Sequence, residues 1–214
     1  GSEMCIRDRN WFAYYKSLKQ RNSLLKNNRI SDIYAWNIKL SDYGNIITKS
    51  RETFFNQTLK HFKIILSLIN AVDVFDFLDH IEIEFFNGWS NQKTLLHTLE
   101  ENIDSDTRRK TTLHGPHKSD IKFFINGIDA KQVLSRGEQK FFSILWSCAQ
   151  NEVLKNVYDI DPILIIDDIK SIGFNIDFFG KNSIVVNGIP NGFPKAATSP
   201  IGKTSKLGFG KVSP

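Results

Sequence analysis

The amino-acid sequence predicts an α/β protein with a helical arm, and three observations lead to that fold class. Apolar residues recur at helical spacing through residues 10–70, and the period changes to two at residue 80. A further helix that begins near residue 135 is followed by four consecutive apolar residues and two aspartates. Such an apolar run is typical of a strand buried on both faces of a sheet. We therefore expect helices first and a covered sheet after them.

The arm is predicted from two helical segments. Residues 10–29 carry apolar side chains at roughly helical spacing, and Ser31 or Asp32 is placed to cap a second helix that continues to residue 70. The second helix has apolar positions in steps of three and four, interrupted near residue 50: Trp36, Leu40, Tyr43, Ile47, Phe55, Leu59, Phe62, Leu66 and Ile69. Two helices joined by so short a link are expected to pair antiparallel, with a packing role and no chemistry.

The predicted head begins with the alternating stretch "HIEIEFF" at residues 80–86, which is typical of an amphipathic strand. Residues 92–103 are expected to be helical. The stretches "DIKFFIN" and "IDAKQV" flank Asn126-Gly127, which predicts a hairpin. A long helix should then run from Ser135 to about Asn156 and bury one face, formed by Phe141, Leu145, Cys148, Ala149 and Val153.

Composition limits the class of protein. A chain of 214 residues with 41% hydrophobic residues can form one large domain or two small ones. It has no apolar run near the ~20 residues that cross a bilayer, so no membrane partner is expected. Its two cysteines have no disulfide-framework or metal spacing, which favours a reducing compartment. A net charge of +5 is compatible with nucleic acid as a partner.

The start of the helix near residue 135, "LSRGEQK", has a composition that capping alone does not explain. Ser135 and Glu138 have the spacing of a capping box. Gly137, however, costs roughly 1 kcal/mol relative to alanine inside a helix. A glycine is useful there if a ligand must approach the backbone. Amide groups at a helix N-terminus, with a hydroxyl beside them, suit a phosphate.

Two further motifs carry side chains that could do chemistry. "ILIIDD" places Asp167 and Asp168 at the end of the apolar strand, where an acid can hold Mg²⁺ or simply form a strand-to-loop turn. "HGPHKSD" offers His114, His117 and Asp120 as metal ligands. Gly-Pro between the histidines forms a turn, and no further Cys or His follows at suitable spacing, which favours a structural or domain-joining loop over a zinc site.

Together, four motifs resemble those of the RecF family of ABC-type ATPases: "SLKQRNSLLK", "TLHGPHKSD", "LSRGEQK" and "ILIIDD". The resemblance runs from about residue 10 to residue 171. It implies the C-terminal part of an α/β ABC-type (P-loop NTPase) head with an arm of antiparallel helices. It also implies a cytoplasmic bacterial protein at the nucleoid that dimerises around ATP, binds single- and double-stranded DNA, and works with RecR and RecO-like mediators to load recombinase at gapped DNA.

The same resemblance assigns roles to individual residues. Ser135 and Gly137 of the signature motif would face the γ-phosphate of an ATP held by the opposite subunit, and Gln139 would support that loop. Asp167 would hold the Mg²⁺, and Asp168 would orient the hydrolytic water. Two alternatives stay open: a non-catalytic interaction or DNA-binding module, and a fragment of a chromosome ATPase of the SMC or Rad50 type, which would need a much longer arm.

The sequence departs from the family at both ends. Residues 1–9, "GSEMCIRDR", lack the apolar region of a signal peptide and are expected to be a non-native leader. The arm then covers 10–79 and the head 80–171. Residues 172–214 hold 7 of the 13 glycines and 4 of the 6 prolines, which predicts a divergent tail, frameshifted or disordered. Within it, "ATSPIGKTS" fits a relaxed phosphate-loop pattern. It lacks the preceding strand and the following helix that a P-loop requires. We therefore expect that this stretch does not bind ATP and that this chain alone does not hydrolyse it.

Overall fold

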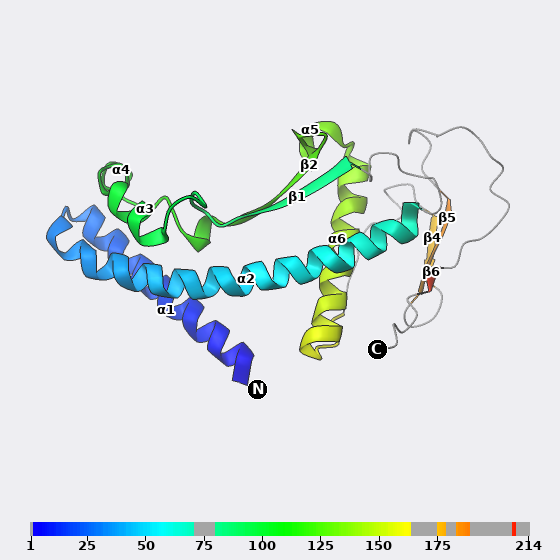
Figure 1. The fold of residues 1–214 in the computed structure, drawn as a ribbon, viewed down its shortest axis with the longest axis horizontal. Coiled ribbons are helices and arrows are strands. Elements are labelled where there is room, and N and C mark those ends of the chain that lie inside the picture. The colour runs from blue at the N-terminus through cyan, green and yellow to red at the C-terminus, as the bar shows by residue number, and fades with distance from the viewer. Residues whose placement is uncertain (1, 71–79, 164–174, 179–182, 189–206, 209–214) are drawn as a thin grey trace. The chain divides into compact units, whose positions relative to one another are not determined.

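A computed structural model describes residues 2–70, 80–163, 175–178, 183–188 and 207–208 (Figure 1). The chain divides into two compact units. The first comprises Gly1–Asn56 and Ile83–Lys122, and the second comprises Gln57–Glu82 and Phe123–Pro214. Each unit is therefore built from segments that are separate in the sequence.

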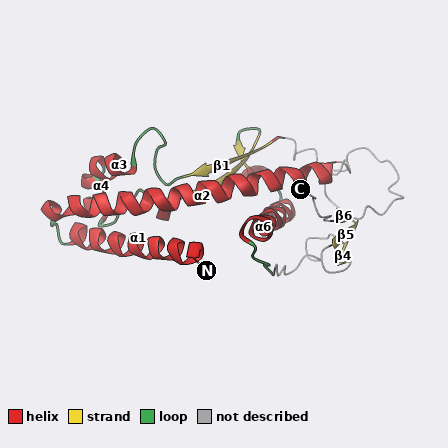
Figure 2. Ribbon diagram, turned by 60° about the horizontal axis from the view of Figure 1, so that its bottom comes forward, coloured by secondary structure: helices red, strands yellow, loops and turns green. Residues whose placement is uncertain are grey.

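The first unit contains the paired helices that the sequence predicts. Helix α1 covers Ser2–Lys26, and a single 3-10 turn, η1 (Ile30–Asp32), leads into helix α2 (Ile33–Asn70). Figure 2 shows α1 lying antiparallel beside α2. Helix α1 begins earlier than the expected residue 10, because residues 2–9 continue the same helix. At the start of α2, Arg29 and Asp32 form an exposed ion pair beside the 3-10 turn.

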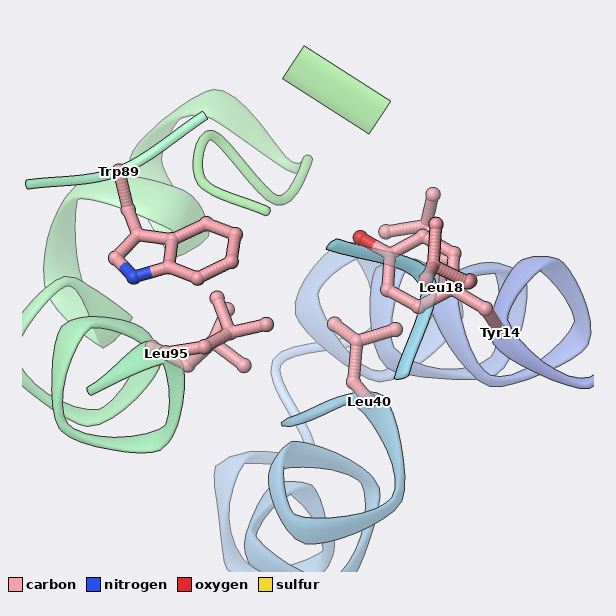
Figure 3. Packing of buried hydrophobic residues seen from close by; sticks show 7 residues of the cluster. Tyr14, Leu18, Leu40, Trp89 and Leu95 are labelled. Atoms are coloured by element: carbon pink, nitrogen blue, oxygen red, sulfur yellow. The ribbon is translucent and has the colours of Figure 1, made fainter. Parts of the chain in front are cut away.

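The core of the first unit joins both helices to a segment some 50 residues later. Tyr14 and Leu18 of α1 and Leu40 of α2 meet Trp89 and Leu95 (Figure 3). Of the predicted apolar stripe, Leu40, Ile47, Phe55 and Phe62 are buried, whereas Trp36, Tyr43, Leu59 and Leu66 are only half-buried. The prediction therefore identified the buried face of α2 correctly and overestimated its width.

The single helix expected at residues 92–103 is two short helices. Helix α3 covers Leu95–Glu101 and helix α4 covers Ile103–Arg109. The Thr94 side chain caps α3 by accepting a hydrogen bond from the His97 amide at 3.2 Å. After α4, Lys110 takes a left-handed conformation that ends the helix.

A three-stranded sheet with the order β1-β2-β3 contains the predicted strand and hairpin. Strand β1 (Ile81–Phe86) alternates between half-buried and exposed residues, as its sequence predicts. Strand β2 (Asp120–Ile125) pairs antiparallel with β3 (Ile128–Asp129). Asn126 and Gly127 both have positive φ in the intervening two-residue turn.

The expected strand "IDAKQV" is largely wrong. Only Ile128–Asp129 is extended, and Ala130–Val133 forms the short helix α5. Asp129 explains the change, because its side chain accepts a hydrogen bond from the Lys131 amide at 2.8 Å and so caps a helical turn.

Helix α6 (Arg136–Tyr158) follows in the second unit, close to the predicted bounds. Phe142 and Trp146 of this helix pack edge-to-face against Phe62 and Phe123 with ring centroids 5.0–5.4 Å apart. Of the predicted buried face, Phe141, Leu145, Ala149 and Val153 are buried and Cys148 is half-buried.

Three short strands lie within the segment predicted to be a divergent tail. They are β4 (Asn175–Phe178), β5 (Ser183–Gly188) and β6 (Leu207–Gly208), in antiparallel order β4-β5-β6. Among the described helices, none is both long and apolar enough to cross a membrane.

Candidate functional site

The start of α6 is fixed by the capping box that the sequence predicts. The Ser135 hydroxyl oxygen accepts a hydrogen bond from the Glu138 amide at 3.3 Å. In return, the Glu138 carboxylate accepts one from the Ser135 amide at 2.7 Å. Because Glu138 is buried, its carboxylate lies on the inner side of the first turn, and the two hydrogen bonds fix the conformation of that turn.

The capping box leaves a defined set of donors unused. The Ser135 oxygen accepts from Glu138, so its hydroxyl proton stays available for another acceptor. The amides of Arg136 and Gly137 precede the first intrahelical hydrogen bond, which the Gln139 amide donates to the Ser135 carbonyl at 2.9 Å. Neither of these two amides has an acceptor within the described part of the chain. Among the described residues, one hydroxyl proton and two amides at this helix end therefore have no acceptor.

Gln139 fastens the segment that leads into the helix. Its side-chain amide donates to the Leu134 carbonyl at 2.8 Å and to the Lys131 carbonyl at 3.2 Å. Lys131 is the second residue of α5, and Leu134 is the residue that follows this helix. Gln139 thus holds the segment that leads into α6, and its role beside an ATP phosphate stays a prediction.

The outer side of this turn is accessible and carries no negative charge. Ser135 and Arg136 are exposed and Gly137 is half-buried. Lys140, one turn further on, is also exposed, and the acid of the first turn, Glu138, is directed inward. Free amide donors at the positive end of a 23-residue helix can bind an anion such as a phosphate.

The two predicted aspartates, Asp167 and Asp168, lie outside the described residues, as does the phosphate-loop-like stretch at residues 197–205. Of the predicted site, the structure brings together Ser135, Gly137 and Gln139.

The "HGPH" loop is a structural joint, which agrees with the interpretation favoured from its sequence. His117 donates from Nε2 to the Thr112 carbonyl at 3.1 Å, so its Nδ1 is the acceptor for the Tyr14 hydroxyl at 2.6 Å. Arg51 of α2 donates to the Pro116 carbonyl and to the Ser119 hydroxyl, each at 2.6 Å. Among the described residues, no group of three or more His, Cys, Asp or Glu side chains could hold a metal ion.

Behind this loop lies a buried charge cluster that sequence reasoning missed. The Arg21 guanidinium is fully buried and donates to Asp106 at 2.6 Å, to the Thr112 hydroxyl at 2.7 Å and to Asn37 at 2.7 Å. Arg21 lies three residues after Leu18 and four before Leu25, which are both buried, so it shares the buried face of α1 although its charge predicts exposure. We call Arg21, Asn37, Leu99, Asp106 and Thr112 the Arg21 cluster; Leu99 joins it through its carbonyl, at 3.1 Å.

Burial shifts the ionisation of the groups around this joint. Desolvation lowers the pKa of Arg21, although its hydrogen bond and charge attraction to Asp106 act in the opposite direction. Burial also raises the pKa of Tyr14 and lowers the pKa of His117. The histidine therefore favours the neutral form, which its two hydrogen bonds already fit.

Comparison with known proteins gives a consistent result. No family model matches the chain. The DNA replication and repair protein RecF of Nitrosococcus oceani is 34% identical over 170 residues, which are 75% of this chain and 44% of that protein. RecF of Hahella chejuensis is 34% identical over 162 residues, 74% of this chain and 43% of the relative. RecF of Francisella tularensis is 35% identical over 155 residues, 72% of this chain and 43% of the relative.

Solved structures extend the similarity to the fold. The recombination mediator protein RecF with ATP, of the RecFOR pathway, matches with a TM-score of 0.62 and 22% identity over 77% of this chain and 46% of that chain. A second RecF structure matches with a TM-score of 0.64 and 24% identity over 76% of this chain and 46% of that chain. The predicted fold, a partial ABC-type head with a helical arm, is confirmed.

The sequence and the fold thus lead to the same relative, although this chain spans less than half the length of the curated proteins that it matches. Over about three quarters of its length, the chain is a homologue of RecF.

Proposed function

We propose that this chain supplies the signature-motif half of a composite ATP site in a RecF-like recombination-repair ATPase. The observation that carries the proposal is the exposed start of α6, where a hydroxyl and two free amides are held in place by Glu138 and Gln139. The ATP itself would be held by the P-loop of a second subunit.

The chemistry of such a half-site is electrostatic. Phosphoryl transfer depends mainly on positioning and on stabilising the charge of the transferred group. The Ser135 hydroxyl and the Gly137 amide would donate to γ-phosphate oxygens across the subunit interface. Asp167 and Asp168 would act on the Mg²⁺ and on the attacking water, and these two roles rest on the resemblance of "ILIIDD" alone.

The biological role follows from the relatives and extends beyond what this chain can do by itself. The named relatives are DNA replication and repair proteins, and the matched structures belong to the RecFOR pathway. We infer a cytoplasmic, nucleoid-associated protein that dimerises with ATP, binds single- and double-stranded DNA and cooperates with RecR and RecO-like mediators. Its task would be recombinase loading at gapped DNA during recombinational repair, replication restart and the SOS response.

A complementation experiment tests the half-site. The partner is a full-length RecF in which the serine of its own signature motif is replaced by alanine. This variant should still bind ATP through its P-loop, but it should not complete the ATP site of a second subunit. Added to it, the 214-residue chain should form an ATP-dependent complex in sedimentation experiments and restore ATP hydrolysis.

The matched variants compare two serines of the same segment. Ser135→Asp keeps a good helix cap but directs a carboxylate at the phosphate, so it should abolish the complex and the hydrolysis. Ser143→Asp places the same charge at an exposed position two turns further along α6 and should leave both intact. If the unmodified chain gives no ATP-dependent complex, or if Ser135→Asp supports one, the proposed half-site is wrong and the non-catalytic interaction module becomes the better description.

A further inference from the structure

Residues 9–31, which span most of helix α1 and the turn after it, carry positive charge with no acid to balance it. They include six lysines and arginines and no aspartate or glutamate, so their formal charge of six exceeds the +5 of the whole chain. Three lysines of α1 are exposed and form no ion pair in the described part of the chain: Lys16, Lys19 and Lys26. A cation is usual in the last turn, where Lys26 lies, but Lys16 and Lys19 lie too far from the helix end for that reason to apply.

The three lysines share one face of α1 with two exposed aromatic rings. At 3.6 residues per turn, six exposed side chains fall within a sector of about 100°, and we call them the α1 outer face: Phe12, Tyr15, Lys16, Lys19, Ser23 and Lys26. The buried residues Tyr14, Leu18 and Leu25 lie on the opposite side of the helix. With a rise of 1.5 Å per residue, the α1 outer face is about 21 Å long.

Packing within the first unit does not account for the two rings. Phe12 is 69% exposed and Tyr15 is 47% exposed, although Trp11 and Tyr14 beside them stack on each other. The Lys19 ammonium lies 4.7 Å from the centroid of the Tyr15 ring, as in a cation–π contact. The α1 outer face therefore offers flat apolar rings directly beside positive charge.

The loop after α4 adds a further cation at one end of this face. The Thr112 amide donates to the Asn22 side chain of α1 at 2.8 Å, and the exposed Lys110 precedes Thr112 by two residues. Lys26 follows Asn22 by one helical turn. At the other end, Asp8 is exposed one turn before Phe12. Along α1 itself, the surface without acids therefore begins after Asp8 and continues to the end of the helix.

Single-stranded DNA is the partner that fits both properties of this face. Its phosphates bind lysines, and its unpaired bases can stack on aromatic side chains whatever their identity. In a duplex the bases already stack on one another, so exposed rings would add nothing. A helix that lies on a membrane has its apolar side chains on one face and its charges on the other. Here the rings and the charges share one face, which argues against a lipid surface.

We propose that the α1 outer face binds single-stranded DNA, with phosphates on its three lysines and unpaired bases stacked on Phe12 and Tyr15. The binding needs no ATP, because none of these residues belongs to the ATP half-site. The inference deepens the proposed function, since it gives the DNA partner named there a surface, and it rests on that function for the choice of DNA over RNA.

The lysines are tested by fluorescence anisotropy of a labelled oligothymidylate of about 20 nucleotides, without ATP. Each phosphate contact to a single strand contributes about 0.7 to the slope of log K against log salt. The double variant Lys16→Ala, Lys19→Ala should therefore reduce this slope by about 1.4. Lys39→Ala is the matched control and should leave the slope unchanged. Lys39 is an exposed lysine over an aromatic ring, that of Trp36, but it belongs to α2.

Two serine variants test the stacking. Phe12→Ser and Tyr15→Ser should each weaken binding about fivefold or more and leave the salt slope unchanged, because a stacked base adds affinity without releasing counterions. Tyr34→Ser is the control, since Tyr34 is a 58% exposed tyrosine of α2, and it should not weaken binding. All the replaced side chains are exposed, so the thermal midpoints should match that of the unmodified chain.

Each contrary result overturns a stated part. No binding of oligothymidylate, or binding that the lysine variant does not alter, overturns the surface. Equal affinity for a hairpin duplex, or normal binding by both serine variants, overturns the stacking of unpaired bases. Tighter binding of oligouridylate overturns the choice of DNA, and binding of phosphatidylglycerol vesicles without oligothymidylate binding assigns the face to a membrane. A failed complementation with RecF, by contrast, overturns the ATP half-site and leaves this surface standing.

Discussion

Removing the Arg21 side chain should destabilise the protein more than any other single charge deletion among its described ion pairs. The Arg21 and Asp106 side chains are both fully buried, and they are joined by a 2.6 Å ion pair. Arg21→Leu fills much of the same volume but leaves the Asp106 carboxylate in the interior without its cation. The remaining donor to that carboxylate is the Leu113 amide, at 3.0 Å.

The expected magnitude follows from burial. Breaking a buried pair by removing one partner costs about 3–5 kcal/mol, because an uncompensated charge stays inside. Domains are stable by roughly 5–15 kcal/mol in total, so Arg21→Leu should remove a large share of that stability. Arg29→Leu is the matched control. Its ion pair with Asp32 is exposed, and its loss should change the unfolding free energy by less than about 1 kcal/mol.

Urea unfolding followed by far-ultraviolet circular dichroism measures both variants. The double variant Arg21→Leu, Asp106→Leu removes the orphaned carboxylate as well, and it should be more stable than Arg21→Leu alone. A loss below about 1 kcal/mol for Arg21→Leu would refute the reasoning, because the carboxylate would then have reached solvent or another donor. So would a double variant whose destabilisation equals the sum of the single changes.

Three further outcomes are expected. Ser135→Ala should lower the unfolding free energy by about 1 kcal/mol through loss of the cap, whereas Ser135→Asp should stay within about 0.5 kcal/mol; equal losses would contradict the capping box. Gly88→Ala should destabilise the chain far more than Gly127→Ala in urea titrations. Both glycines have positive φ, but a Cβ at Gly88 would overlap the Gly115 carbonyl oxygen, whereas the space around Gly127 is open. Burial lowers the pKa of His117 in the folded protein, so the unfolded chain binds this proton more tightly, and the unfolding free energy should fall as the pH drops from 6.5 toward the depressed pKa. His117→Gln should flatten this pH dependence, and an unchanged slope would show that another group causes it.

Local patterns predicted the parts of this structure that are decided by neighbouring residues. The capping box of Ser135 and Glu138 depends on a spacing of three residues and appears as expected. The turn at Asn126-Gly127 depends on two residues with positive φ, and it is also present. The predicted strand after that turn is too long, because Asp129 caps a helical turn that begins at Ala130.

Long-range contacts account for the rest. The charge of Arg21 predicts exposure, and its burial depends on Asp106 and Thr112, which lie 85 and 91 residues later in the sequence. The family resemblance, by contrast, was accessible from the sequence, since "LSRGEQK" and "HGPHKSD" are short motifs at a definite separation.

The joint between the arm and the "HGPH" loop has a consequence for how the protein is made. The first unit combines Gly1–Asn56 with Ile83–Lys122, so its core cannot form until the ribosome has synthesised the second of these segments. At typical synthesis rates of 5–20 residues per second, the 66 intervening and closing residues take roughly 3–13 s. During that interval α1 has emerged, but Arg21 has neither Asp106 nor Thr112, and Tyr14 has no His117. We therefore expect a nascent chain in this state to expose the apolar face of its helices, and truncations that keep only the two arm helices to aggregate.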